Sequence, residues 1–319
     1  MTAEIDTVLD RRRLRRRLTI WRGLAIAALV GVVFALGAST GEWSEIGAKQ
    51  IARVTITGTI TEDRDQLEML KKIADSDKAA ALLVFVNSPG GTTTGGEALF
   101  GALRDVAKKK PVVAQFGTVA ASAGYIVGLG ADHIVTRANT ITGSIGVLIQ
   151  WPEVSQMLDK IGVKFNEIKS GDLKAVPSPF EPLSEEGQKV TKSMIDEGFR
   201  WFLGLVEARR GIKPDQIPGL TQGRVFTGRE AVQLKLADSI GGEDEAVAWL
   251  QSARNVDKGL KVVDWKPSSE ASLGLFSSVG SAAASFFNHT YLAQMLGRAP
   301  SMAGLGLDGL ISVWHPSEN

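Results

Sequence analysis

The sequence contains no cysteine among its 319 residues, and it has only three histidines. The absence of cysteine excludes a disulfide scaffold, zinc–thiolate sites and thiol catalysis. His133, His289 and His315 lie far apart in the sequence and form no paired spacing such as H-E-x-x-H. We therefore expect neither a metal nor another cofactor, and a serine–histidine pair is hard to assemble.

Charge is unevenly distributed, although the formal net charge is only +1. Six arginines lie in residues 11–17, "RRRLRRR", and Arg22 adds a seventh. The 19 residues that follow, 23–41, carry no charge. At about 1.5 Å per residue, a helix of this length nearly crosses a hydrocarbon core of ~30 Å. Because arginine enters lipid only at high cost, the basic stretch is expected to stay on the cytoplasmic side.

This pattern predicts a single-pass anchor over residues 21–41, with Trp21 and Trp43 at the two membrane interfaces. Residues 1–20 then form a cytosolic basic arm, and the rest lies on the extracytoplasmic (periplasmic) side of the inner, or cytoplasmic, membrane. The alternative is a cleaved signal peptide, with small residues near Ala38, but the basic and apolar stretches are both longer than usual. Since the arginines abut the apolar run, we expect no nucleic-acid partner.

Strands and helices alternate in the remainder of the sequence. Residues 48–60 alternate apolar and polar side chains, which is typical of a strand, and residues 80–87 form a continuous apolar run, which predicts a strand buried on both faces. The following "NSPGG" is a turn by composition. Other predicted elements are strands over residues 111–116 and 132–138 and helices over residues 63–76, 97–109, 184–211 and 228–235 and from about residue 242. This order predicts an α/β domain with a largely parallel sheet.

The predicted domain covers residues 42–266, and its longest helix has its apolar face at Val190, Met194, Phe199, Phe202 and Val206. Residues 267–319 are rich in serine, glycine and alanine and show no strong period. We expect them to form a flexible or weakly helical tail, whose role the sequence leaves open.

Ser122 is the first candidate for chemistry. It lies in "GTVAASAGYIVG", residues 117–128, where an apolar run begins that is typical of a helix. Small neighbours would let a peptide backbone approach, and the N–H of Ala123 would point at the oxygen of an attacked carbonyl. A serine that only caps the helix is the simpler interpretation and remains open.

A second oxyanion donor would come from Gly91 in "NSPGG", because a glycine turn at a strand end frees backbone N–H groups. A general base is then needed, and a lysine serves only if burial and the absence of acidic partners keep it neutral. "KSGDLKAVPSPF" offers Lys169, before a solvent-type turn, and Lys174, before an apolar stretch fixed by prolines. Lys174 is the better candidate; His133, at the start of a short strand, is its rival.

Several motifs occur in an order that resembles one known family: "NSPGG", "AASAGY", "ADHIV", "TGSIGV", "KSG" with a lysine three residues on, "SPF" and "GRVFTGREAVQLKLADSIGG". They resemble bacterial signal peptide peptidase A, the membrane-bound serine–lysine peptidases, over residues 50–245. The resemblance implies a ClpP/crotonase-like fold of ββα units. It also implies that Ser122 is the nucleophile, Lys174 the general base, Ser144 the residue that orients Lys174, and Gly91 and Ala123 the oxyanion hole.

The same resemblance implies a ring-like homo-oligomer such as an octamer, in which the serine and the lysine can come from neighbouring subunits. Its substrates would be remnant signal peptides and other membrane-associated or unfolded polypeptides, cut after small or apolar residues. Ala123 departs from the usual glycine, so its methyl group is expected to narrow the pocket, and "TTTGGEAL" after "NSPGG" is less typical. The alternatives are a crotonase-type acyl-CoA enzyme, a stomatin-associated membrane peptidase and a non-catalytic membrane scaffold; the anchor argues against the first, because CoA is cytosolic.

Overall fold

The structure is a computed structural model that describes residues 21–22, 48–267 and 311–313. The predicted cytosolic arm, nearly all of the predicted anchor and most of the predicted tail lie outside these residues, as do Ala38, Trp43, His289 and His315. Among the helices in the described ranges, none combines the length and the hydrophobicity that crossing a bilayer requires.

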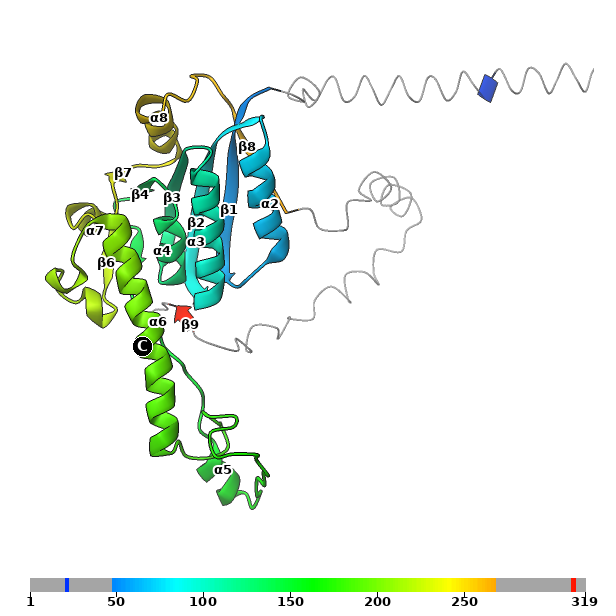
Figure 1. Ribbon diagram of the computed structural model, residues 1–319, viewed down its shortest axis with the longest axis vertical. Helices are drawn as coiled ribbons and strands as arrows, with labels where there is room; N and C mark the ends of the chain where they lie inside the picture. The colour runs from blue at the N-terminus through cyan, green and yellow to red at the C-terminus, as the bar shows by residue number, and fades with distance from the viewer. Residues whose placement is uncertain (1–20, 23–47, 268–310, 314–319) are drawn as a thin grey trace, which may run out of the picture. The chain divides into compact units, whose positions relative to one another are not determined.

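One mixed sheet organises the described residues (Figure 1). Its strands are β1 (Gln50–Ile60), β2 (Ala79–Thr92), β3 (Val112–Ala121), β4 (His133–Thr136), β5 (Ile141–Gly143), β6 (Val225–Thr227), β7 (Ser239–Ile240), β8 (Val262–Asp264) and β9 (Ile311–Val313). The main order is β6-β5-β3-β2-β1-β8, with β4 between β3 and β7 and with β9 on β2. All pairs are parallel except β5–β6 and β2–β9, so the predicted largely parallel α/β sheet is confirmed.

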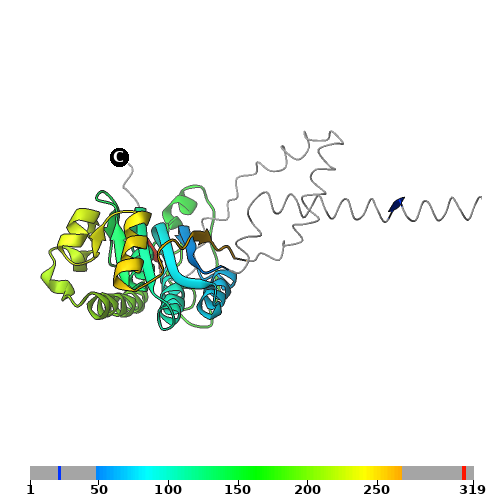
Figure 2. The same ribbon diagram turned by 90° about the horizontal axis from the view of Figure 1, so that it is seen from above.

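Helices cover both faces of this sheet (Figures 1 and 2). The helices are α2 (Arg64–Asp75), α3 (Thr93–Ala107), α4 (Ala123–Leu129), α5 (Ser155–Lys160), α6 (Glu185–Arg210), α7 (Gly228–Gln233) and α8 (Glu243–Ala253). Side chains of α2, α3, α4 and α6 join the larger core, and α8 contributes to a smaller second core. Along β2, Leu82 and Val84 enter the larger core whereas Ala81 and Leu83 enter the smaller one, which confirms a strand buried on both faces.

The long helix α6 agrees with the prediction at its ends but not along its whole face. Ser184 caps it by accepting a hydrogen bond from the Gly187 N–H at 3.1 Å, and Gly211 ends it in the left-handed conformation. Val190 and Met194 belong to the predicted apolar face of the helix, yet they are 44% and 49% exposed. The reason is that the first half of α6 projects beyond the sheet (Figure 1).

The "NSPGG" segment is not the predicted turn, because β2 continues through it to Thr92. Gly90 and Gly91 remain paired with β1, and the ladder shifts register just before them. Pro89 lies at this irregularity, where a residue without an N–H removes no ladder hydrogen bond. Both glycines therefore belong to the sheet and are held in place by it.

A lobe, which we define as residues 151–194, contains α5 and the first part of α6 and extends past the sheet (Figure 1). Eleven large apolar side chains are exposed in the described part of the chain, and nine of them belong to this lobe. They are Met157, Ile161, Val163, Phe165, Ile168, Leu173, Phe180, Val190 and Met194. An apolar surface of this extent is typical of a contact with another protein or another subunit.

Candidate active site

Ser122 and Ser144 follow neighbouring parallel strands at the same register. β3 and β5 pair Ala121 with Gly143, so each serine is the next residue after a paired strand end. Both serines have positive φ, 57° for Ser122 and 50° for Ser144. The Ser122 N–H donates to the Gly143 carbonyl at 2.8 Å. A non-glycine residue in such a conformation costs roughly 1–3 kcal/mol, and such residues concentrate at functional sites.

The structure speaks against a helix-capping role for Ser122. Its side chain makes no capping hydrogen bond to α4, although the residue stands directly before that helix. Ser122 is 1% exposed, so its hydroxyl is almost entirely removed from bulk water. The residue therefore combines a backbone at positive φ with a buried hydroxyl, at a turn that leads from a strand into a helix.

The first turn of α4 packs directly on the "NSPGG" end of β2. A β carbon at Gly124 would lie 2.8 Å from the Ser88 carbonyl oxygen, so no larger residue fits there. Gly91 is equally constrained, since a β carbon there would lie 1.9 Å from the Ile60 carbonyl oxygen. Both positions therefore require glycine, but only the contact of Gly124 with Ser88 joins the Ser122 turn to β2, because Gly91 is packed against Ile60 of β1.

Ala123 does not narrow the site as expected. Its side chain is fully buried and faces α3, where a β carbon on Gly96 would lie 3.3 Å from the Ala123 β carbon. Ala123 is absent from the residues that line the cavity beside Ser122. The methyl group thus packs into the protein and leaves the open side of Ser122 unchanged.

A cavity of about 380 Å³ is lined by both Ser122 and Ser144. The rest of its wall is mainly apolar and is formed by Ile145, Gly146, Val147 and Leu148, by Ile195 and Phe199 of α6, and by Thr221, Gln222 and Gly223. Such a wall accepts small or apolar ligand side chains. The spacing of apolar residues in α6 assigned Phe199 to the apolar face of the helix. Its position beside Ser122 depends on how α6 crosses the sheet, which the spacing does not reveal.

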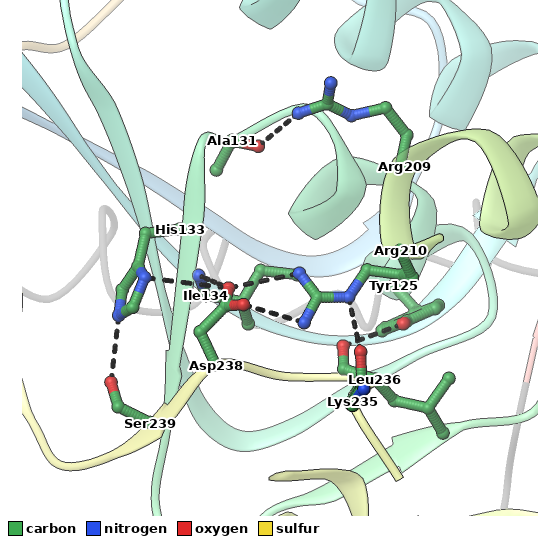
Figure 3. Close-up of polar contacts among 10 residues, drawn as sticks. All are labelled: Tyr125, Ala131, His133, Ile134, Arg209, Arg210, Lys235, Leu236, Asp238 and Ser239. Carbon is green, nitrogen blue, oxygen red and sulfur yellow. Dashed lines mark hydrogen bonds and ion pairs between the residues drawn. The ribbon is translucent and has the colours of Figure 1, made fainter. Parts of the chain in front are cut away.

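Hydrogen bonds hold α4 behind Ser122 (Figure 3). The Tyr125 hydroxyl donates to the Leu236 carbonyl at 2.8 Å. Arg209 of α6 donates to the carbonyls of Leu129 and Ala131 at 2.9 and 2.8 Å, at the other end of the helix. Because all seven residues of α4 are buried, the turn that carries Ser122 is fixed from behind.

The two candidate lysines lie in the lobe and differ in their surroundings. Lys169 pairs with Glu167 at 3.2 Å and also with Glu181. The hydrogen bond from Lys169 to Glu181 is the main reason why the pKa of Lys169 is raised above its ordinary value. Lys169 therefore stays charged and is unsuited to act as a neutral base. Lys174 is exposed, and it does not line the cavity of Ser122 and Ser144.

His133, the rival base, belongs to a separate cluster (Figure 3). Its Nε2 lies 3.0 Å from the Ser239 hydroxyl, and its Nδ1 lies 3.7 Å from Asp238, too far for a hydrogen bond. The ring stacks on Trp249 at 4.6 Å between centroids, and Asp238 is already bound by Arg210. Ser239, His133 and Asp238 therefore link β4, β7 and α6 through their side chains. None of the three lines the Ser122 cavity.

The fold and the site define a candidate hydrolase, in which two serines follow neighbouring strands of a largely parallel α/β sheet and line one apolar cavity. Comparisons with known proteins agree with it. The model of Peptidase family S49 matches residues 104–257. A Synechocystis sp. protein named as a protease is 35% identical over 210 residues, which cover 66% of this chain and 76% of that protein. The chain therefore belongs to Peptidase family S49.

Two further similarities extend the comparison. An Enterococcus faecium protein named as a signal peptide peptidase SppA is 32% identical over 246 residues, which cover 71% of this chain and 70% of that protein. Among solved structures, a ClpP1 mutant of Listeria monocytogenes is similar, with a TM-score of 0.41 and 17% identity, over 61% of this chain and 94% of that one.

Proposed function

We propose that this S49 peptidase is a membrane-anchored serine endopeptidase with Ser122 as nucleophile, Lys174 as general base and Ser144 as the residue that orients the lysine. The observation that carries the proposal is Ser122 itself, which is strained and buried and shares an apolar cavity with Ser144. The backbone N–H groups of Gly91 and Ala123 form the oxyanion hole in this proposal.

The reaction is a two-step acyl transfer. Lys174 removes the hydroxyl proton of Ser122, whose oxygen attacks the peptide carbonyl while the oxyanion accepts hydrogen bonds from the two backbone donors. Lys174 then passes its proton to the leaving amine, and the peptide C–N bond breaks to give an acyl-enzyme. Water, deprotonated by the same lysine, releases the acyl group and restores Ser122.

The lysine must be neutral to begin this sequence, and Lys174 is exposed. A dry environment without an acidic partner favours the neutral form of a lysine side chain. We propose that a neighbouring subunit supplies it, in a ring-like homo-oligomer such as an octamer. Lys174 lies in the lobe, whose exposed apolar side chains would be buried by such a contact. Docking of one lobe against the next subunit would then bring Lys174 to that subunit's Ser122.

The substrates we propose are remnant signal peptides and other membrane-associated or unfolded polypeptides, cut after small or apolar residues. The apolar wall formed by Ile145, Ile195 and Phe199 supports this preference. The uncharged residues 23–41 support an anchor in the cytoplasmic membrane, with the arginines on the cytosolic side and the peptidase domain on the extracytoplasmic side.

The test is cleavage of a quenched peptide by purified full-length variants. Ser122→Ala and Lys174→Ala should each lower kcat by at least ~10³-fold and leave the thermal unfolding midpoint near that of the wild type. Lys164→Ala, which also removes an exposed lysine of the lobe, is the matched control and should retain activity. Substantial cleavage by Ser122→Ala would refute the assignment. Absence of labelling of the wild type by a serine-directed fluorophosphonate would favour a non-catalytic scaffold.

A further inference from the structure

The edge of the sheet at which the parallel strands begin carries an excess of positive charge. Three segments that each lead into a strand meet at this edge, and we call them together the basic edge. They are residues 71–78, before β2, residues 104–110, before β3, and residues 254–261, before β8. These segments contain ten lysines and arginines but only four aspartates, whereas the other residues of the range 48–267 contain 18 basic and 23 acidic side chains. Positive charge is therefore concentrated at one end of the strands.

Contacts hold the three segments around the start of β1. The Gln50 N–H donates to the Lys78 carbonyl at 2.8 Å, and the Ile51 N–H donates to the Lys261 carbonyl at 2.9 Å. An ion pair of 2.6 Å joins the second segment to the first. Figure 1 shows this end of β1, β2 and β3 opposite the end at which the lobe lies. The basic edge is therefore one surface, and it lies at the opposite end of β3 from Ser122.

Several lysines of the basic edge are available to a partner. Exposed lysines whose side chains form no hydrogen bond or ion pair with another residue of the described ranges include Lys72, Lys78 and Lys258. Arg104 and Arg254, by contrast, both pair with Asp132, at 3.0 and 2.8 Å. Because the first group of side chains is not engaged in holding the fold, its concentration at one edge indicates a negatively charged partner outside the chain.

The chain enters the domain at this same edge, because β1 begins there at Gln50. If residues 21–41 span the membrane as proposed, only the eight residues 42–49 separate the anchor from β1. Even a fully extended segment of eight residues spans at most about 29 Å, so the start of β1 stays within that distance of the anchor. Lysine and arginine side chains near an anionic membrane are attracted to its lipid headgroups, over about one Debye length of ~8 Å at physiological salt. The basic edge is thus the part of the domain that can reach the headgroups most readily.

We propose that the basic edge docks on anionic phospholipid headgroups, such as those of phosphatidylglycerol, at the membrane surface that faces the peptidase domain. This docking rests on the anchor of the proposed function, and it specifies in addition which face of the domain meets the bilayer. β3 runs from Val112 at this edge to Ala121, and its ten residues span roughly 30 Å at ~3.3 Å each. Ser122 then lies at the end of the domain remote from the headgroups. A polypeptide therefore has to extend about ten residues out of the membrane before it can be cut.

Because the chain has no cysteine, a single fluorescent label can test the docking in the full-length protein. Ser252→Cys places the label in the last turn of α8, beside the basic edge, and Thr61→Cys places it just after β1, at the other end. Both positions are exposed. The measurement is quenching by lipids with a spin-labelled headgroup, in nanodiscs of phosphatidylcholine alone or with added phosphatidylglycerol. We expect the label at position 252 to be quenched strongly only with phosphatidylglycerol and at low salt, and the label at position 61 to stay unquenched throughout.

Removal of charge from the basic edge should abolish this quenching. Each charge near an anionic surface strengthens association about fivefold, so loss of three should lower the ratio of docked to undocked domain about 100-fold. The edge variant combines Lys72→Gln, Lys78→Gln and Lys258→Gln. The matched variant removes three exposed lysines elsewhere and should keep the quenching; it combines Lys164→Gln, Lys189→Gln and Lys213→Gln. Quenching that is equal in the two kinds of disc, that survives in the edge variant, or that affects position 61 instead of position 252 would overturn the docking.

Failure of the anchor can be distinguished from failure of the docking. If alkaline carbonate extracts the full-length protein from membranes, the proposed anchor falls, and cosedimentation with phosphatidylglycerol vesicles then decides the docking alone. Binding that is weakened in the edge variant but not in the matched variant would support the docking, and absence of binding would overturn it. A chain that docks but does not cleave a quenched peptide would refute the proposed peptidase and leave the docking in place.

Discussion

Ser122 and Ser144 stand one residue beyond a pair of partners, Ala121 and Gly143, on neighbouring parallel strands. The same register that pairs the strands therefore places two serines side by side, both at positive φ and both lining one cavity. Because main-chain hydrogen bonds fix this juxtaposition, substitution of either side chain should change the chemistry without moving the other serine.

The role of Ser144 can be separated from its backbone strain. Ser144→Ala and Ser144→Gly both remove the hydroxyl, but only alanine is strained at a φ of 50°, at a cost of ~1 kcal/mol. We expect both to lower kcat by about 10–100-fold, the effect of one lost hydrogen bond of ~1–3 kcal/mol. The loss should fall on kcat with KM little changed, because a residue that orients the base acts on the chemical step. Loss of stability with an unchanged kcat would leave Ser144 only a structural role.

Glycine substitutions probe the packing of α4 on β2. Gly124→Ala places a methyl group 2.8 Å from the Ser88 carbonyl oxygen, so we expect it to lower the free energy of unfolding by about 1–3 kcal/mol and to slow fluorophosphonate labelling. Gly204→Ala is the control, because a β carbon there meets nothing within 4 Å. It should stabilise α6 by about 0.5–1 kcal/mol. Denaturant titration measures the free energy of unfolding of both variants. Equal values would contradict the close packing of α4 on β2.

Sharing of the site between subunits predicts complementation. Chains with Ser122→Ala and chains with Lys174→Ala should each be inactive alone. When the two are co-expressed, about a quarter of the contacts in a mixed ring join an intact Ser122 to an intact neighbouring Lys174. Peptide cleavage should therefore return to about a quarter of the wild-type value. Replacing the second chain by the double variant leaves no intact Ser122, and it should restore nothing. Mixed rings without activity would place both residues of a functional dyad in one chain.

The cluster around His133 predicts a dependence of stability on pH. Burial is the main cause that lowers the pKa of His133; Asp238 opposes it and Arg210 adds to it. The unfolded chain then binds more protons than the folded one below pH ~6.5, so the free energy of unfolding falls as the pH is lowered through that value. His133→Gln should remove this step. The denaturation midpoint measured between pH 8 and 5 tests it, and an identical slope in the variant would exclude His133 as its source.

Asp238 should act at lower pH. Burial, the largest single cause, would raise the pKa of its carboxyl group, but the hydrogen bond and charge of Arg210, the Ile134 N–H and the charge of His133 together lower it. A carboxyl with a depressed pKa stabilises the fold above its unfolded pKa of about 4, and this contribution is lost as the pH falls through the folded value. Asp238→Asn should therefore flatten the stability profile below pH ~4. A profile that keeps its acid limb would show that other carboxylates dominate it.

Elements with strong local signals were predictable from the sequence. The continuous apolar run of β2 indicated burial on both faces, and Ser184 before a pair of glutamates marked the start of α6. Ser122 and Gly91 were proposed from motifs and Ser144 from the family resemblance. The structure brings Ser122 and Ser144 to one cavity and packs Gly124 of α4 against Ser88 of β2.

The remainder depended on contacts between distant parts of the chain. β5 and β6 have three residues each and are strands only because they pair with their neighbours, so no periodicity could reveal them. "NSPGG" has the composition of a turn, yet β1 and β9 hold its glycines in the sheet. The surroundings of Lys174 in the active protein depend in our proposal on a second chain, which no pattern within one chain encodes.

The burial of every residue of α4 limits how the peptidase can be controlled. A helix with no solvent-exposed face cannot unfold locally without exposing the core that it completes. The helix that follows Ser122 therefore unfolds only together with the whole domain. Effectors that act by loosening the turn at Ser122 would destroy the protein. Control therefore has to act outside α4, by determining which polypeptide reaches Ser122. Inhibitors are better directed at the cavity beside Ser122 than at α4 itself.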